Sequence, residues 1–195
     1  LEYSISTNSE IYISDIKTGI ETNISTGISG YDQDPVFSPD GKKMVWRSMA
    51  RDGFEADKDR IMIYDFASAK YTDFSEKFDQ GSNNFEWSAD SKTLYFLSSI
   101  HGTVQIYSLN IATKEIKQIS SGTWDYLSIK LAGKEKITAK QSMLNPTEIY
   151  KIDASGKETQ LSFTNKEILK DIRSAKVEER WMTTTDNKKM LTWVI

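Results

Sequence analysis

The sequence repeats one pattern, and this repeat limits the folds open to the chain more than any other feature does. An apolar run, a short turn and a more polar run follow one another at four places, which are residues 11–25, 61–74, 105–120 and 148–163. Each pattern predicts a β-hairpin. The hairpins recur every ~40 to 50 residues, which is typical of folds that stack one supersecondary unit on the next.

The apolar run of every hairpin ends in a short polar residue, and these residues are Asp15, Asp65, Asn110 and Asp153. Such side chains accept hydrogen bonds from the backbone of a turn that follows them. We therefore expect the same turn geometry at the same place in each repeat.

A second kind of hairpin lies between these units. In residues 34–50, two apolar runs flank Ser38-Pro39-Asp40-Gly41, a combination that suits a type I turn. Residues 84–97 contain another copy, and residues 125–140 contain a weaker one whose turn lacks Pro and Asp.

Together the two hairpins give four antiparallel strands per unit, the pattern of a β-propeller blade. Residues 44–46 and 94–97 are continuously apolar, as expected of strands covered on both faces, whereas residues 116–119 alternate like an outer strand. We predict an all-β chain that forms a partial, open β-propeller of four-stranded antiparallel blades. Residues 1–163 would hold the end of one blade and then three blades, at about residues 31–76, 80–120 and 123–163.

The pattern changes after Phe163. Thr164 and Glu167 have the spacing of a capping box, which predicts a short amphipathic helix over residues 165–173. Residues 176–184 and 188–195 then predict two strands joined by a turn at Asp186-Asn187. The chain starts without Met and ends within an apolar run, so we expect it to be part of a longer protein.

Composition excludes several partners. The net charge is −3 without a basic stripe, so we expect no nucleic acid, and no apolar run approaches the ~20 residues of a membrane helix. There is no Cys, and a single His, His101, offers too few ligands for a catalytic zinc site. No Gly-x-Ser-x-Gly motif occurs, and His101 is expected in a solvated turn. We therefore predict no catalytic residue, no metal and no cofactor in this chain.

Three other features have a structural and a functional interpretation. Residues 51–60 alternate acidic and basic side chains, which favours a salt-bridged surface loop. Alternatively, Arg51, Glu55 and Asp57 bind a substrate. The spacing of the acidic residues does not fit the calcium-binding loop of an EF-hand. The acidic residues of segment 31–35 are expected in a loop between blades rather than at a metal. We expect the recurring tryptophans to pack between blades, and these are Trp46, Trp87 and Trp124.

The turns F-S-P-D-G-K and W-S-A-D-S-K resemble the WD-like repeats of TolB-type propellers. The loop R-D-G-F-E-A-D-K-D-R-I and the tail from Thr164 resemble the propeller and the junction to the α/β-hydrolase domain in prolyl oligopeptidase-family serine peptidases, in the dipeptidyl-peptidase V and acylaminoacyl-peptidase-like branch. The resemblance implies that residues 164–195 begin a hydrolase domain, and that Ser, Asp and His lie beyond Ile195. The acidic pair that binds the substrate amine in dipeptidyl-peptidase IV-type relatives belongs to earlier blades, so no role is carried over to Glu55 or Asp57.

The resemblance leads to one functional expectation, and a second remains open. The first is a non-catalytic propeller fragment of a periplasmic or secreted serine exopeptidase, with short peptides and the hydrolase domain as partners. The alternative is a TolB-like propeller that serves as a protein-interaction scaffold. If the chain is such a fragment, uncovered blade faces would make the isolated chain self-associate.

Overall fold

The computed structural model describes residues 6–195 as a series of antiparallel sheets. A hairpin of β1 (Tyr12–Ser14) and β2 (Glu21–Asn23) comes first. The first blade consists of β3 (Asp32–Phe37), β4 (Lys43–Ser48), β5 (Arg60–Asp65) and β6 (Lys70–Asp73). The second blade consists of β7 (Ser82–Trp87), β8 (Thr93–Ile100), β9 (Thr103–Asn110) and β10 (Ile116–Gln118). The third blade contains β11 (Asp125–Tyr126), β12 (Lys130–Ala132), β13 (Glu135–Gln141), β14 (Glu148–Ile152) and β15 (Glu158–Gln160).

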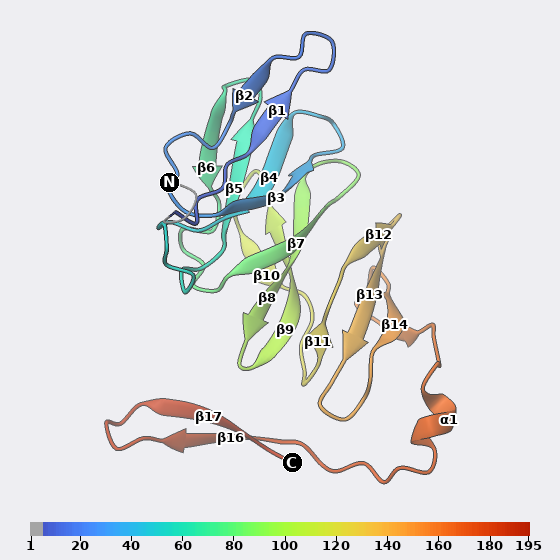
Figure 1. Cartoon of the computed structure of the whole chain (residues 1–195). Helices are drawn as coiled ribbons and strands as arrows, with labels where there is room; N and C mark the ends of the chain where they lie inside the picture. The colour runs from blue at the N-terminus through green and yellow to red at the C-terminus, as the bar shows by residue number, and fades with distance from the viewer. Residues whose placement is uncertain (1–5) are drawn as a thin grey trace.

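The sheets follow one another in chain order as a fan (Figure 1), and strands within each sheet pair with their sequence neighbours, except that β11 pairs with β13. The predicted fold class is confirmed: the chain is all-β, with four-stranded antiparallel sheets, one short helix and a C-terminal hairpin. Over residues 6–195 the fan stays open, since no sheet pairs the third blade back to the first hairpin.

The innermost strand of each of the first two blades is bent by the same device. The register of β3 on β4 shifts between Gln33 and Val36, where Asp34 has φ 57°. The register of β7 on β8 shifts between Asn83 and Glu86, where Asn84 has φ 54°. Asp and Asn tolerate this left-handed conformation better than most residues, so the bulges follow from the sequence.

In the weaker hairpin copy at residues 125–140, the inner strand is broken into β11 and β12, both of which pair with β13. Side chains take over the hydrogen bonds in the gap. Thr138 Oγ1 donates to the Ser128 carbonyl at 2.6 Å, and the Ala139 N–H donates to Ser128 Oγ at 3.3 Å. The five-stranded sheet is thus a four-stranded blade with an interrupted inner strand.

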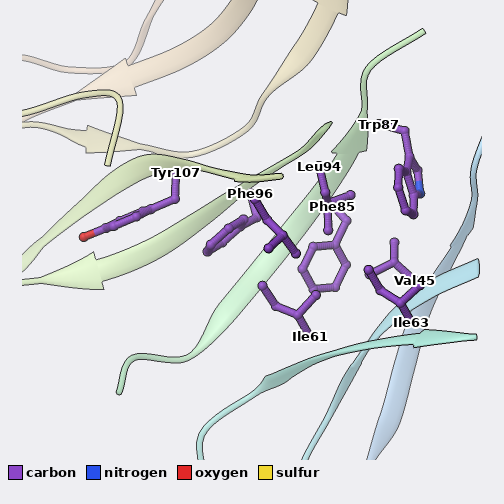
Figure 2. Close-up of a cluster of buried hydrophobic side chains, with 9 residues drawn as sticks. Val45, Ile61, Ile63, Phe85, Trp87, Leu94, Phe96 and Tyr107 are labelled. Carbon is purple, nitrogen blue, oxygen red and sulfur yellow. The ribbon is translucent and has the colours of Figure 1, made fainter. Parts of the chain in front are cut away.

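The core lies between blades. Figure 2 shows Val45, Ile61 and Ile63 of the first blade against Phe85 and Trp87 of the second. A second cluster joins the β1–β2 hairpin to the first blade around Trp46, and a third joins the second and third blades. The expected packing of Trp46 and Trp87 between blades is confirmed, with exposed fractions of 0% and 6%. Trp124 only borders the third cluster and remains partly exposed.

Each outer strand is held by a serine that the sequence analysis did not single out. Ser25 Oγ accepts the Ile11 N–H at 3.0 Å, and Ser75 Oγ accepts the Ile61 N–H at 2.9 Å. Ser120 and Ser162 repeat the contact with the amides of Ile106 and Ile149, both at 2.8 Å. The serine therefore satisfies a backbone donor of the third strand of each unit, one residue beyond the last pair of the ladder with the outer strand.

The predicted hairpin of the tail is confirmed, whereas the capping box predicted for its helix is wrong. Strands β16 (Glu178–Thr183) and β17 (Lys189–Val194) pair around a turn in which Asn187 has φ 61°. Helix α1 spans only Lys166–Leu169, and the expected capping box is absent because Asn165 is the N-cap and makes no side-chain cap bond. The backbone N–H and the side chain of Asn165 instead donate to Glu148 of β14, at 2.9 and 3.0 Å, so the helix start is fixed by the blade.

Candidate functional site

One end of the blades carries both loop 51–60 and the tail. Since the strands alternate in direction, the links β4–β5, β8–β9 and β13–β14 all lie at the same end, which we call the tail end. In Figure 1 the β16–β17 hairpin lies beneath the β8–β9 link at this end. Loop 51–60 is the β4–β5 link, so it shares this end with the tail.

The tail contacts the second blade through the two residues of the β8–β9 turn. The His101 ring meets the Trp181 ring edge-on, with centroids 5.0 Å apart. A Cβ on Gly102, which has φ 71°, would lie 2.8 Å from Trp193 Nε1. The expectation that His101 is a solvated turn residue is confirmed, since it is exposed and has φ 50°. Its ring therefore serves as a contact for the tail.

A cavity of about 290 Å³ lies between the blade ends and the tail. Its apolar walls include Trp124, Leu144, Val177 and Trp193, and its polar lining includes Asp125. Within residues 6–195 the Nε1–H of Trp193 is buried without a hydrogen-bond acceptor. Pockets commonly form at such junctions, with apolar walls and few polar groups. The sequence analysis missed this cavity because its lining comes from separate links that only the fan brings together.

The charged side chains of loop 51–60 pair partly with one another and mostly with neighbouring segments of the chain. Arg51 binds Asp57 through its guanidinium and its backbone N–H, and this contact lowers the pKa of the Asp57 carboxyl. The Arg51 guanidinium also stacks on the Phe54 ring, 3.8 Å from its centroid. Asp52 accepts the backbone N–H of Thr7 at 2.8 Å, which ties the loop to the segment before β1.

Glu55 differs from its neighbours in the loop. It is exposed and makes no ion pair or hydrogen bond with another described residue, whereas Lys58 donates to the Ser75 carbonyl at 2.9 Å and Asp59 lies 3.4 Å from Arg47. The geometry thus favours a salt-bridged loop with one free carboxylate at its surface. Substrate binding by Arg51, Glu55 and Asp57 stays a prediction.

The expected loop at residues 31–35 is wrong, because β3 already begins at Asp32. Asp32 is buried, and its Oδ1 accepts the Trp46 Nε1–H at 2.8 Å, which draws this residue into the sheet. Burial raises the pKa of the Asp32 carboxyl, while the hydrogen bond from Trp46 opposes the rise. Asp34 pairs with Arg47 at 2.6 Å. Both carboxylates therefore have structural partners.

The described residues 6–195 contain no cluster of three His, Asp or Glu side chains that could hold a metal ion. Across the same residues, none of the helices has the length and apolar character needed to cross a bilayer. His101, the sole histidine, contacts Trp181 rather than a serine and a carboxylate.

Comparison with known proteins agrees with this architecture. The sequence model of the family described as "TolB beta propeller domain" matches residues 3–172. Dipeptidyl-peptidase 5 of Porphyromonas gingivalis is 37% identical over 100% of this chain, and that of Porphyromonas endodontalis is 42% identical over the same share. The chain spans only 29% and 28% of the length of these relatives.

Among solved structures, the acylaminoacyl peptidase of Pyrococcus horikoshii superposes with a TM-score of 0.72 and 22% identity, over 94% of this chain and 27% of that one. This likeness concerns the fold, and it includes most of the chain. The chain belongs to the TolB beta propeller domain family, and it is homologous to a part of the dipeptidyl-peptidase 5 proteins.

Proposed function

We propose that this chain is the propeller part of a serine exopeptidase of the dipeptidyl-peptidase or oligopeptidase type. In this proposal the propeller carries no catalytic residue, restricts access to short peptides and helps to position them. The catalytic Ser, Asp and His belong to a hydrolase domain that continues from β17.

The position of the tail is the observation that carries the proposal. The β16–β17 hairpin contacts the second blade at the tail end, through His101 and Gly102. A domain that continues from β17 would therefore lie against the tail end of the blades and face loop 51–60. Peptides that reach its active site would pass between the two parts, where the loop can contact them.

Glu55 is the side chain of this loop best suited to contact a peptide. A free, exposed carboxylate can pair with the ammonium group at the start of a short peptide. Arg51 and Asp57 neutralise one another and hold the loop in shape around Phe54. We therefore assign Glu55 to the peptide amine, and Arg51 and Asp57 to the support of the loop.

Kinetics of the full-length parent test this assignment. Glu55→Gln should raise KM severalfold for dipeptidyl reporter substrates with a free amine and leave N-acylated substrates unchanged. Glu115→Gln is the matched control, because Glu115 lies in the β9–β10 turn at the opposite end of the blades. An unchanged KM for free-amine substrates would refute the role of Glu55 but would leave the rest of the proposal standing. Turnover by purified residues 1–195 that a serine reagent abolishes would refute the proposal of a non-catalytic propeller.

The runner-up function is a TolB-like propeller that scaffolds a protein partner, which the family match supports equally. The two differ in the sequence expected after Ile195: a peptidase parent must encode a nucleophile elbow of the Gly-x-Ser-x-Gly type and then Asp and His. We also propose, from the resemblance, that the parent works in the periplasm or outside the cell. Fractionation of the native host, with activity confined to the cytoplasm, would overturn that location.

A further inference from the structure

Three aromatic rings surround the ammonium group of Lys140 in the third blade. Lys140 lies on β13, and only 5% of its side chain is exposed. Its Nζ lies 4.1 Å from the ring centroid of Trp124, 4.7 Å from that of Tyr150 and 5.5 Å from that of Tyr126. All three distances fall within the range of attraction between a cation and an aromatic face.

A carboxylate lies beside these three rings, and we call the group of Trp124, Tyr126, Tyr150 and Glu158 the aromatic box. Glu158 on β15 forms an ion pair with Lys140 and accepts a hydrogen bond from the Tyr126 hydroxyl. Burial, and then the Glu158 carboxylate, raise the pKa of Tyr126, so its hydroxyl stays protonated and remains a donor. The box thus pairs one buried cation with one anion and satisfies the phenol between them.

Lys136 shows that burial of a lysine on this strand does not by itself create such a box. It lies on the same face of β13 as Lys140 and is also buried. Its Nζ faces a single ring, that of Tyr95 at 4.8 Å, and has no ion-pair partner among the described residues. The surroundings of Lys140 resemble those of bound alkylammonium ligands, which aromatic cages recognise.

The rings of the box also form walls of the hollows at the tail end. Trp124 lines the 290 Å³ cavity, opposite the tail residues Val177 and Trp193. Tyr150 lines a second hollow of about 400 Å³ between the blade and α1, with Phe163 and Leu169. A change in the aromatic box that moves the Trp124 or Tyr150 ring would therefore alter the wall of the corresponding hollow.

We propose that Lys140 is a positioning residue: its ammonium is held as an internal ligand of the aromatic box and fixes Trp124 and Tyr150 as preformed walls of the tail-end hollows. Lys140 thereby holds the cavity wall in a fixed shape, and the tail can dock without the entropic cost of ordering a mobile aromatic side chain. This role holds for any function of the propeller, so it can fail or succeed independently of the peptidase proposal.

Fluorine NMR of the chain labelled with 5-fluorotryptophan tests the positioning role, because the 5 tryptophans give separate reporters. Lys140→Met should shift and broaden the Trp124 resonance and alter that of Trp193 across the cavity, while Trp46 and Trp87 keep their positions. Lys140→Arg should keep the native spectrum, and Lys136→Met is the matched control. An unchanged Trp124 resonance in a folded Lys140→Met variant would overturn the proposal.

Chemical rescue tests the claim that the cation is bound as a ligand. Lys140→Ala should lower the melting temperature, and added n-propylammonium should restore part of the loss and return the Trp124 resonance toward its native position. The same salt should not rescue Lys136→Ala or a Lys140→Ala/Glu158→Gln double variant. Equal effects on all three variants would show a general salt effect and overturn the proposal. If Lys140→Ala does not fold, the same titration is decisive with Lys140→Ser, where absence of rescue counts against the box.

Discussion

Gly102 is a position where a methyl group would meet the tail. Gly102→Ala places a Cβ 2.8 Å from Trp193 Nε1, so we expect the β16–β17 hairpin to leave the second blade. The left-handed backbone at this residue adds a cost of roughly 1–2 kcal/mol for any L side chain. The measurement is limited proteolysis of residues 164–195, which should become markedly faster.

Gly133→Ala is the control for this substitution. Gly133 has φ 64°, close to the value at Gly102, and nothing lies within 4 Å of its Cβ position. Both variants should lose similar stability from backbone strain, but only Gly102→Ala should release the tail. Equal proteolysis of the two tails would show that the contact with Trp193 does not hold the hairpin.

Ser75 illustrates a polar residue whose role lies in the hydrogen bonds of the buried backbone. It is fully buried, accepts the Ile61 N–H and donates to Asp73 at 2.8 Å. Ser75→Ala leaves a buried backbone donor without a partner, so we expect a loss of about 1–3 kcal/mol in the free energy of unfolding. Urea titration measures it. Ser121→Ala, at an exposed site, should change stability far less, and a matching loss there would contradict the explanation.

The sequence could predict the strands at residue scale but not all of their buried faces. In β13 the apolar residues Ile137 and Ala139 would ordinarily be placed inward, yet Lys136, Thr138 and Lys140 are the buried ones. Both faces of a blade are meant to be covered, so apolarity does not say which face meets which neighbour. The aromatic box that accepts Lys140 depends on distant residues such as Glu158, 18 positions away along the chain, which no local pattern links to it.

The turn after the third strand of each unit was predictable as an element, and its hydrogen bonds confirm the expectation. Asp65 Oδ1 accepts the Ser68 N–H at 2.9 Å, and Asn110 Oδ1 accepts the Ala112 and Thr113 amides at 3.0 Å. The chemistry of a short polar side chain before a turn is local, so the sequence alone carries it. Asp65 and Asn110 also differ in charge, so the pH dependence of stability can test this turn.

The Asp65 carboxylate should make the first blade sensitive to acid. Its contact with Lys43, and then the Ser68 amide, lower the pKa of Asp65 from 3.8 to about 2. A depressed pKa contributes stability that is present above the unfolded value and is lost as the pH falls from about 4 toward 2. Asp65→Asn should flatten this part of the pH profile of unfolding by urea. Asn110→Asp, at the equivalent position of the second blade, should steepen it, and an unchanged slope in both variants would contradict the linkage.

Helix α1 marks where element-scale prediction failed. Thr164 and Glu167 have the right spacing for a capping box, but Glu167 pairs with Lys170 at 2.7 Å and Asn165 donates to Glu148. A carboxylate 17 residues away in the chain competes successfully for the helix start. A capping motif reports only local preference, and tertiary contacts override it in a helix of four residues.

The architecture of the whole molecule was the most predictable level, because the period of the hairpins fixes the number of strands in each unit. The position of the tail was not predictable. It depends on the edge contact of Trp181 with His101 and on the lack of a side chain at Gly102, two features that carry no periodic signal. The structure shows that the tail contacts the second blade.

The open ends of the fan lead to a last prediction, that the isolated chain self-associates. On the outer face of the third blade no further sheet covers Ile149 and Leu161, which are 38% and 49% exposed within the described chain. Adjacent apolar residues on an uncovered sheet favour contact with a second copy. Light scattering at rising concentration should therefore show dimers or larger species. Ile149→Glu should shift the chain toward the monomer, whereas Ile168→Glu on α1 should not, and a monomer at all concentrations would refute association through this face.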